Sequence, residues 1–215
     1  EAKHRSFVGM HPIPVVHGMT LGELARMIDG EGWLRDGLRC KLTVIPCRGY
    51  THRSRYRLPT APSPNLPNMR AVYLYPSLCF FEGTPVSLGR GTDFPFQAYG
   101  HPELQGDFSF TPRSNAGAKN PPLKDKLCHG VDLRTSPSDE RIWEREVDLG
   151  YVIDCYRQLN LGEKFFTPMF DRLTGTDYVR QMILQGAGAD RIKASWADDV
   201  ERFKQTRKPY LLYEE

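Results

Sequence analysis

Hydrophobic positions change their spacing about two thirds of the way along the chain. In the last third, apolar residues recur every three to four positions in 147–159, 177–185 and 190–207, which predicts three helices. Before it, short apolar runs alternate with proline and glycine, which predicts short strands joined by long ordered loops. Short mixed strands followed by carboxy-terminal helices indicate an α+β fold.

A further helix start lies near the amino terminus. Thr20 can cap a helix, and Glu23, three residues later, completes a capping box. Apolar residues at helical spacing continue to Ile28, and Gly30 or Gly32 ends the helix. This segment therefore predicts an amphipathic helix with one buried face.

Four short segments have the composition of strands. They are residues 42–45, which Pro46 closes, 94–99, 108–111 and 131–134. Residues 59–67 contain too many prolines for a helix or a central strand. Residues 71–81 fit a short helix or a strand equally well, and residues 82–92 are predicted to form a loop or tight turns. The tail at 208–213 is predicted to be extended and is a candidate for pairing at a sheet edge.

Composition and charge narrow the class of protein. The 215 residues are 40% hydrophobic and 26% charged, which is ordinary globular usage and excludes a disordered or collagen-like chain. No run approaches the roughly 18–20 apolar residues of a membrane span. The net charge of +3 gives little support to nucleic-acid binding. The first six residues contain neither an initiator Met nor a signal-peptide hydrophobic region, which predicts a mature or proteolysed piece, or a domain of a longer protein.

The cysteines give no sign of a metal site. They are odd in number and show neither a CxxC pair nor Cys/His ligand spacing, so we expect no zinc. We expect buried free thiols, with one disulfide as the alternative if the protein is exported. The five positions are Cys40, Cys47, Cys79, Cys128 and Cys155.

The segment 82–92 is the densest candidate for ligand chemistry. Its glycines let the backbone turn or approach a ligand closely, and its polar side chains can hydrogen-bond a sugar. It lacks the Gly-Lys-Ser/Thr ending of a phosphate-binding loop. The alternative is a structural loop in which its carboxylate and guanidinium satisfy each other. The polar side chains in question belong to Glu82, Thr84, Ser87, Arg90 and Thr92.

Three other features are weaker candidates. Asn65 lies in the proline-stiffened segment 61–67 and could present its amide to a ligand at low entropic cost, or could bond its own backbone in a turn. His17 lies just before the predicted helix start and fits a hydrogen-bonding structural role as well as a ligand contact. The basic run 48–57 could attract an acidic ligand such as a carboxylated sugar, or form a solvated loop.

Taken in order, several segments resemble one family over nearly the whole chain. That family is the bacterial exo-β-N-acetylmuramidases, the NamZ-like glycoside hydrolases of peptidoglycan recycling. The matching segments are Phe7-Val8-Gly9, Pro12-Ile13-Pro14, residues 17–24, residues 62–67, the run from Glu82 to Phe96, residues 170–176 and residues 207–213.

The resemblance implies the second half of a longer enzyme. Members are roughly twice this long, so residues 1–215 are interpreted as the carboxy-terminal domain, without the amino-terminal Rossmann-like domain. The family's proposed catalytic glutamate lies in a Gly-Pro-Glu-His-Gly stretch that has no counterpart here. No catalytic residue is therefore assigned, and no metal or cofactor is expected.

The expected function is one wall of a site that removes terminal β-N-acetylmuramic acid from peptidoglycan fragments. Asn65, Glu82, Thr84, Ser87, Arg90 and Thr92 are expected to line the substrate side, with His17 nearby. Arg90 is suited to the lactyl carboxylate of N-acetylmuramic acid, because a guanidinium matches carboxylate geometry. The expected partners are these fragments and the amino-terminal domain of the same protein, with export to the periplasm or beyond the cell. The alternatives are a non-catalytic glycan-binding module and a structural half that docks its partner domain.

Overall fold

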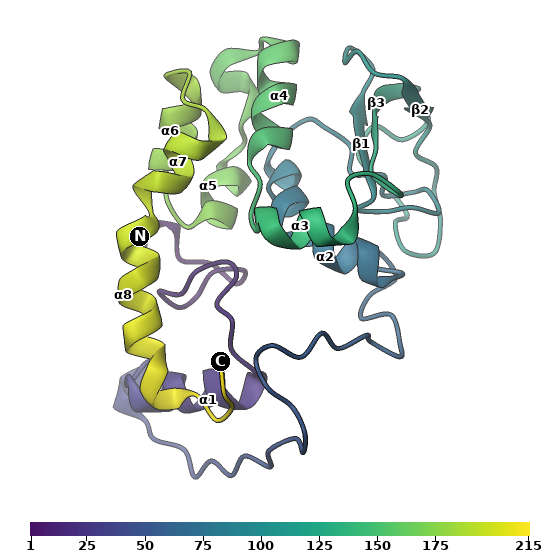
Figure 1. The fold of residues 1–215 in the computed structure, drawn as a ribbon. Coiled ribbons are helices and arrows are strands. Elements are labelled where there is room, and N and C mark those ends of the chain that lie inside the picture. Colours follow the sequence, from purple (N-terminus) through teal and green to yellow (C-terminus); the bar gives the residue numbers. More distant parts are fainter. The chain divides into compact units, whose positions relative to one another are not determined.

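The computed structural model describes residues 1–215, apart from the side chain of Arg145. The chain forms two units, the first made of residues 1–10 and 57–193 and the second of residues 11–56 and 194–215. Helices together with a small antiparallel sheet confirm the α+β class (Figure 1). Within the described residues, no helix is long and apolar enough to cross a membrane.

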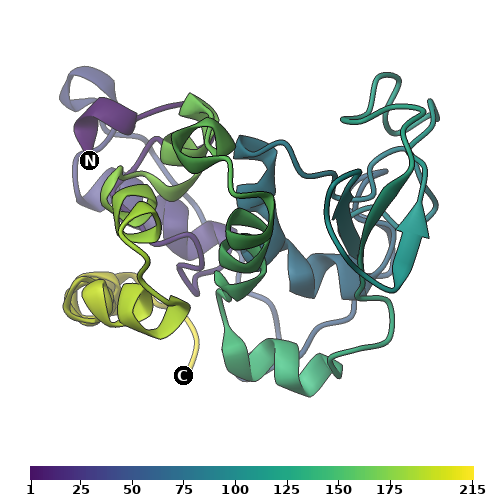
Figure 2. The same ribbon diagram turned by 90° about the horizontal axis from the view of Figure 1, so that it is seen from above.

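The first unit holds the sheet and most of the helices. Strand β3 (Cys128–Asp132) lies between β1 (Ala98–His101) and β2 (Phe108–Phe110), and both pairings are antiparallel. Within this unit the sheet lies at one end and α6 at the other, and α4 lies between them (Figures 1 and 2), where Tyr151 contacts Tyr99 of β1 with ring centroids 5.8 Å apart. The helices are α2 (Met69–Leu78), α3 (Asp139–Arg145), α4 (Gly150–Leu159), α5 (Pro168–Thr174) and α6 (Tyr178–Leu184), followed along the chain by α7 (Ala189–Ser195).

The core of this unit is built around α2 and the short 3₁₀ helix that follows it, η3 (Cys79–Gly83). The side chain of Asn68 caps α2 by accepting a hydrogen bond from the Ala71 N–H at 3.0 Å. Helix α5 packs on η3 at Gly83, where a Cβ would overlap the backbone of Phe170. Phe81 and Phe170 are both 0% exposed, so aromatic packing fixes the position of η3.

The second unit contains α1 (Leu21–Gly30), α8 (Ala197–Arg207) and the 3₁₀ turn η5 (Lys208–Tyr210). The predicted capping box is confirmed, because the Thr20 side chain accepts from the Glu23 N–H while the Glu23 carboxylate accepts from the Thr20 N–H. The predicted helix end is confirmed at Gly30. Glu23 is 0% exposed, which makes its carboxylate part of the interior of this unit.

The predicted strand at 42–45 is wrong. Residues 38–47 adopt no regular secondary structure, and within the described residues every strand belongs to the first unit. A strand is stable only beside a partner, and with none here Ile45 remains 88% exposed. The prediction of an extended tail is also wrong for residues 208–210, which form η5. No residue of 208–213 pairs in a sheet, for the same lack of a neighbouring strand.

Other elements differ in their boundaries. The strands expected at 94–99 and 131–134 run over Ala98–His101 and Cys128–Asp132, because residues 94–97 turn at Phe96. Residues 71–81 resolve as helix, and the segment expected as one helix at 190–207 is interrupted at Trp196 into α7 and α8. Helices α3 and α5 were not predicted.

The cysteines are free. Cys79, Cys128 and Cys155 are buried as expected, whereas Cys40 and Cys47 are exposed. The two exposed thiols lie in residues 38–47 of the second unit, which have no regular secondary structure. Expectation and structure therefore differ at these two positions.

Candidate substrate pocket

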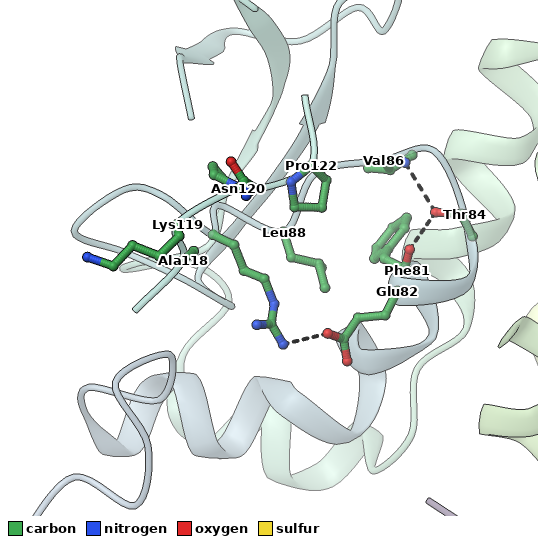
Figure 3. A pocket seen from close by; sticks show the side chains of 11 residues that line it. Phe81, Glu82, Thr84, Val86, Leu88, Ala118, Lys119, Asn120 and Pro122 are labelled. Atoms are coloured by element: carbon green, nitrogen blue, oxygen red, sulfur yellow. Dashed lines mark hydrogen bonds and ion pairs between the residues drawn. The ribbon is translucent and has the colours of Figure 1, made fainter. Parts of the chain in front are cut away.

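A pocket of about 310 Å³ lies in the first unit (Figure 3). This volume is at the low end of the roughly 300–1,000 Å³ typical of small-molecule sites, so the pocket has room for one small ligand. Two segments of chain form its walls. The first contributes Phe81, Glu82, Thr84, Val86, Leu88 and Arg90, and the second contributes Ala118, Lys119, Asn120, Pro121 and Pro122.

The first wall is shaped by hydrogen bonds at the end of η3. The Thr84 hydroxyl donates to the Phe81 carbonyl at 2.9 Å and accepts from the Val86 N–H at 3.3 Å. These bonds turn the chain from η3 into an extended segment, whose side chains of Val86 and Leu88 form the apolar part of the lining (Figure 3). The hydroxyl of Thr84 is therefore largely used by the fold itself.

The charged part of the lining is an ion pair. The Nη2 atom of Arg90 lies 2.5 Å from Oε1 of Glu82, and each side chain is 30% exposed. The guanidinium also lies over the ring of Phe96, 5.2 Å from its centroid. Phe96 is buried and has a φ of +56°, a left-handed conformation that is unfavourable for a bulky residue. Its N–H donates to the Leu88 carbonyl at 2.8 Å, so the turn that carries the ring is held by the loop that carries Arg90.

The second wall approaches the first at Gly91. Gly91 has a φ of +82°, and its carbonyl accepts from the Arg113 N–H at 2.8 Å. A Cβ at Gly91 would overlap the Arg113 carbonyl oxygen and the ring of Pro121. Only glycine fits this position, and its use brings residues 118–122 beside the loop at 82–92.

The other loop residues singled out from the sequence shape the pocket without lining it. Ser87 is 0% exposed, and its backbone pairs with Gly100. Thr92 donates from its hydroxyl to the Gly89 carbonyl at 2.6 Å. Asn65 donates from Nδ2 to the Gly117 carbonyl at 3.0 Å, and so anchors the segment that forms the second wall. A direct substrate contact at any of these positions stays a prediction.

His17 belongs to the second unit, whereas the loop at 82–92 belongs to the first. Its Nδ1 accepts from the Met19 N–H at 3.2 Å, and its carbonyl accepts from Arg207 at 2.9 Å. Burial lowers the pKa of His17, and the positive charge of Arg207 lowers it further. Its environment is that of a neutral residue ordering the turn before α1.

The sequence interpretation did not find the second wall. Lys119 and Asn120 belong to this wall, although the ammonium of Lys119 points away from the other lining side chains in Figure 3, and Pro121 and Pro122 stiffen the backbone that carries them. The only local signal was the proline pair itself. Its position beside the loop at 82–92 depends on contacts between residues more than 20 positions apart in sequence, such as those of Gly91 with Arg113 and Pro121.

The lining of this pocket contains a single carboxylic side chain. Glycoside hydrolysis generally uses two carboxylic side chains, and Glu82 is the one carboxylate in the lining of this pocket. That carboxylate is engaged by Arg90. Burial raises the pKa of the nearby Cys79 thiol to about 12, so it is protonated at neutral pH and unsuited to act as a nucleophile.

One group of side chains elsewhere has the composition of a metal site. Glu1, His4 and Asp177 offer ligand atoms within 4.8 Å of one another, and none of them lines the pocket. The ammonium of Lys3 lies 2.6 Å from Asp177 and 3.1 Å from Glu1, so it pairs with both carboxylates. The group therefore forms an ion-pair cluster with Lys3, in which His4 and Asp177 are partly buried.

Comparison with known proteins places the chain in a family. The family described as exo-beta-N-acetylmuramidase NamZ, C-terminal, matches residues 73–213, and its N-terminal counterpart matches residues 1–70. The chain therefore belongs to a family of peptidoglycan glycoside hydrolases. That family is the NamZ exo-β-N-acetylmuramidases. The interpretation that the chain resembles only the carboxy-terminal half of the family was wrong for residues 1–70, which match the N-terminal model. The expected absence of a Rossmann-like domain stays a prediction.

The individual relatives are longer than this chain. The peptidoglycan beta-N-acetylmuramidase NamZ of Bacillus subtilis (strain 168) is 32% identical over 237 residues, which cover 99% of this chain and 54% of that protein. A crystal structure of a DUF1343 family protein from Bacteroides fragilis NCTC 9343 is 62% identical with a TM-score of 0.98, and covers all of this chain and 61% of that one. A second protein of that description from the same organism has 23% identity, a TM-score of 0.76 and the same coverage, and shows the fold alone. The chain thus spans between half and two thirds of these proteins.

Proposed function

We propose that this chain supplies the substrate-binding wall of an exo-acting β-N-acetylmuramidase, holding the terminal N-acetylmuramic acid of a peptidoglycan fragment. The observation that carries the proposal is the pocket of Figure 3, whose lining joins an arginine and an asparagine to apolar side chains in a member of this family. A muramic acid residue presents the matching groups: a lactyl carboxylate, an acetamide and an apolar ring face.

Arg90 is the proposed carboxylate-binding residue. Its guanidinium is held over Phe96 and is partly exposed in the pocket, so it can reach a ligand without a large rearrangement. A planar guanidinium binds a carboxylate with two parallel hydrogen bonds, which fixes the orientation of the sugar. The acid and base of the reaction are proposed to come from outside this chain, because the pocket lining has a single carboxylate.

The first test compares Arg90→Ala with a matched arginine. Arg134 also stacks on aromatic rings, at 4.8 Å from Phe94, and also pairs with a carboxylate, at 2.7 Å from Asp132, but it does not line the pocket. Binding of N-acetylmuramic acid to the 215-residue chain is measured by NMR titration, with thermal melts alongside. We expect Arg90→Ala to weaken binding about tenfold, the usual scale for losing a charge-assisted hydrogen bond, and Arg134→Ala to leave it unchanged. If Arg90→Ala binds N-acetylmuramic acid as tightly as the wild type but loses much thermal stability, Arg90 is structural.

The second test addresses turnover. Release of N-acetylmuramic acid from a chromogenic β-glycoside is measured with this chain alone and with the chain joined to the additional region that its longer relatives possess. We expect activity only in the joined form. Activity of the chain alone would contradict the proposal and make Glu82 the first candidate for the acid.

A non-catalytic glycan-binding module is the second candidate function. The observation that favours it is the engagement of Glu82 by Arg90, which leaves the pocket lining without a free carboxylate. This candidate predicts that both forms bind the sugar and that neither hydrolyses the glycoside. The turnover test therefore separates the two candidates.

A further inference from the structure

The cation proposed to bind substrate is already paired inside the protein. Glu82 and Arg90 reach each other at 2.5 Å, and the dashed line at Glu82 in Figure 3 marks this pair within the pocket lining. Each side chain is 30% exposed, so the pair is in contact with the space that a ligand would fill. A ligand carboxylate that binds Arg90 therefore meets the carboxylate of Glu82 at the same guanidinium.

We infer that Glu82 lowers the affinity of this pocket for anionic sugars relative to neutral ones, because its carboxylate competes with the ligand's carboxylate for Arg90. This inference rests on the proposed function. A carboxylated sugar such as N-acetylmuramic acid must displace Glu82 from Nη2, or bind beside it against like-charge repulsion. A neutral sugar such as N-acetylglucosamine has no carboxylate and does not enter this competition.

The opposite role for Glu82 would be to orient Arg90 for the ligand. The structure provides another device for that purpose, because the guanidinium rests on the ring of Phe96 at 5.2 Å. Phe96 is 1% exposed, and its ring also contacts Tyr75 with centroids 5.0 Å apart. The platform is thus fixed by packing that does not involve Glu82, and Arg90 keeps its position when Glu82 loses its charge.

The expected size of the effect is modest. The pair is partly exposed to solvent, and pairs of this kind are weak because water screens them and holding two long side chains costs entropy. Removing the charge of Glu82 should therefore tighten binding of an anionic sugar by about two- to fivefold. It should leave a neutral sugar unaffected, because the pocket keeps its shape when glutamine replaces glutamate.

The test uses the 215-residue chain at neutral pH, with N-acetylmuramic acid and N-acetylglucosamine as probes in NMR titrations. Glu82→Gln is the main variant, and Glu82→Ala is the second in case the glutamine does not fold. Asp132→Asn is the matched control, because it also removes one negative charge from an arginine pair, that with Arg134 at 2.7 Å, but lies outside the pocket. This control separates competition at Arg90 from a change in net charge.

The expected result is tighter binding of N-acetylmuramic acid by both Glu82 variants, with unchanged N-acetylglucosamine binding by Glu82→Gln and no effect of Asp132→Asn. Unchanged or weaker N-acetylmuramic acid binding in the Glu82 variants would overturn the inference, as would equal tightening by Asp132→Asn. Binding by Arg90→Ala distinguishes a failure of the proposed function from a failure of the competition at Arg90. If it leaves N-acetylmuramic acid binding unchanged, the proposed function fails and the inference with it. If it weakens binding while Glu82→Gln does not tighten it, the competition alone is overturned.

Discussion

The two units of this protein have interiors of different chemistry. The first unit buries an extensive set of apolar side chains, including Phe81, Phe96, Phe165 and Phe170. In the second unit, the buried side chains among the described residues are Met27 and Glu23. One interior is therefore held by packing, and the other is organised around a single carboxylate.

The carboxylate of Glu23 joins segments that are far apart in sequence. It accepts hydrogen bonds from the Thr20 N–H and the Leu212 N–H, each at 2.7 Å, and its Oε1 lies 3.0 Å from Nε2 of His52. A buried carboxylate is costly unless its oxygens are satisfied, and here the donors come from the start of α1, the basic segment and the tail. The stability of the first unit therefore depends on how well buried apolar side chains fill its interior. The stability of the second unit depends on the ionisation and hydrogen bonds of Glu23.

The largest effect is expected from a cavity in the first unit. Phe170→Ala removes a ring that is 0% exposed and contacts Phe166 with centroids 4.7 Å apart. We expect a loss of about 3–5 kcal/mol in the free energy of unfolding, measured by urea denaturation. Met169→Ala is the control on the same helix, where the side chain is 39% exposed and the expected change is about 0.5 kcal/mol. Equal effects of the two changes would contradict the packing of the buried face of α5 on η3.

The next largest effect is expected from Glu23→Gln in the second unit. The amide keeps the shape of the side chain but turns one acceptor into a donor, which then faces a backbone N–H or His52. We expect a loss of about 2–3 kcal/mol, the scale of a broken hydrogen bond to a buried charged group. Hydrogen exchange measured by mass spectrometry should show the loss of protection in α1 and the tail. Glu31→Gln is the control, because Glu31 is exposed and accepts a hydrogen bond from Tyr210.

Acidification should perturb the second unit in the same place. Burial alone would raise the pKa of Glu23, but the hydrogen bonds from Leu212, Thr20 and His52 outweigh it and hold the pKa below its ordinary value near 4.5. A carboxyl whose pKa is lowered in the folded state contributes stability above its unfolded pKa and loses that contribution as the pH falls through the folded value.

We therefore expect amide protection in α1 to decrease below about pH 4.5, after correction for the intrinsic exchange rate. Glu23→Gln should lack this decrease, because it has no proton to gain. Helix α2 is the internal control, since it contains no acidic residue. A decrease of the same size in the wild type and in Glu23→Gln would show that another group controls the acid response.

The smallest effect is expected from Tyr210→Phe, also in the second unit. The change removes the hydroxyl that donates to Glu31 at 2.7 Å at an exposed site. We expect a loss of about 0.5–1 kcal/mol in the free energy of unfolding, because water replaces most of such a bond. A loss as large as that of Glu23→Gln would show that the second unit is stabilised at its surface as much as at its buried carboxylate.

The candidate site was predictable from the sequence only in part. The loop at 82–92 is dense in glycine and polar residues, and three of its five polar candidates, Glu82, Thr84 and Arg90, line the pocket. The pairing of Glu82 with Arg90 was one of two alternatives, and the structure contains it. Ser87 and Thr92 carry the same types of polar group, but both hydroxyls bond to Gly89 within the loop: that of Ser87 accepts from the Gly89 N–H, and that of Thr92 donates to the Gly89 carbonyl. The backbone of Ser87 also pairs with Gly100.

What the sequence determined by itself is local. The capping box at Thr20 and Glu23, the spacing of apolar residues in α4 and α6 and the α+β class follow from interactions between residues a few positions apart. Membership of the family is also determined by the sequence, because the family's motifs occur in the same order along the chain.

What only the tertiary structure decided depends on contacts between distant segments. The strand predicted at 42–45 fails for lack of a partner, residues 118–122 become a wall of the pocket because Gly91 lets them approach, and Glu23 gains donors from His52 and Leu212. None of these contacts leaves a periodic pattern in the sequence. Local hydrogen bonds and helical spacing act within one turn of chain, whereas packing and burial depend on which segments the whole fold brings together.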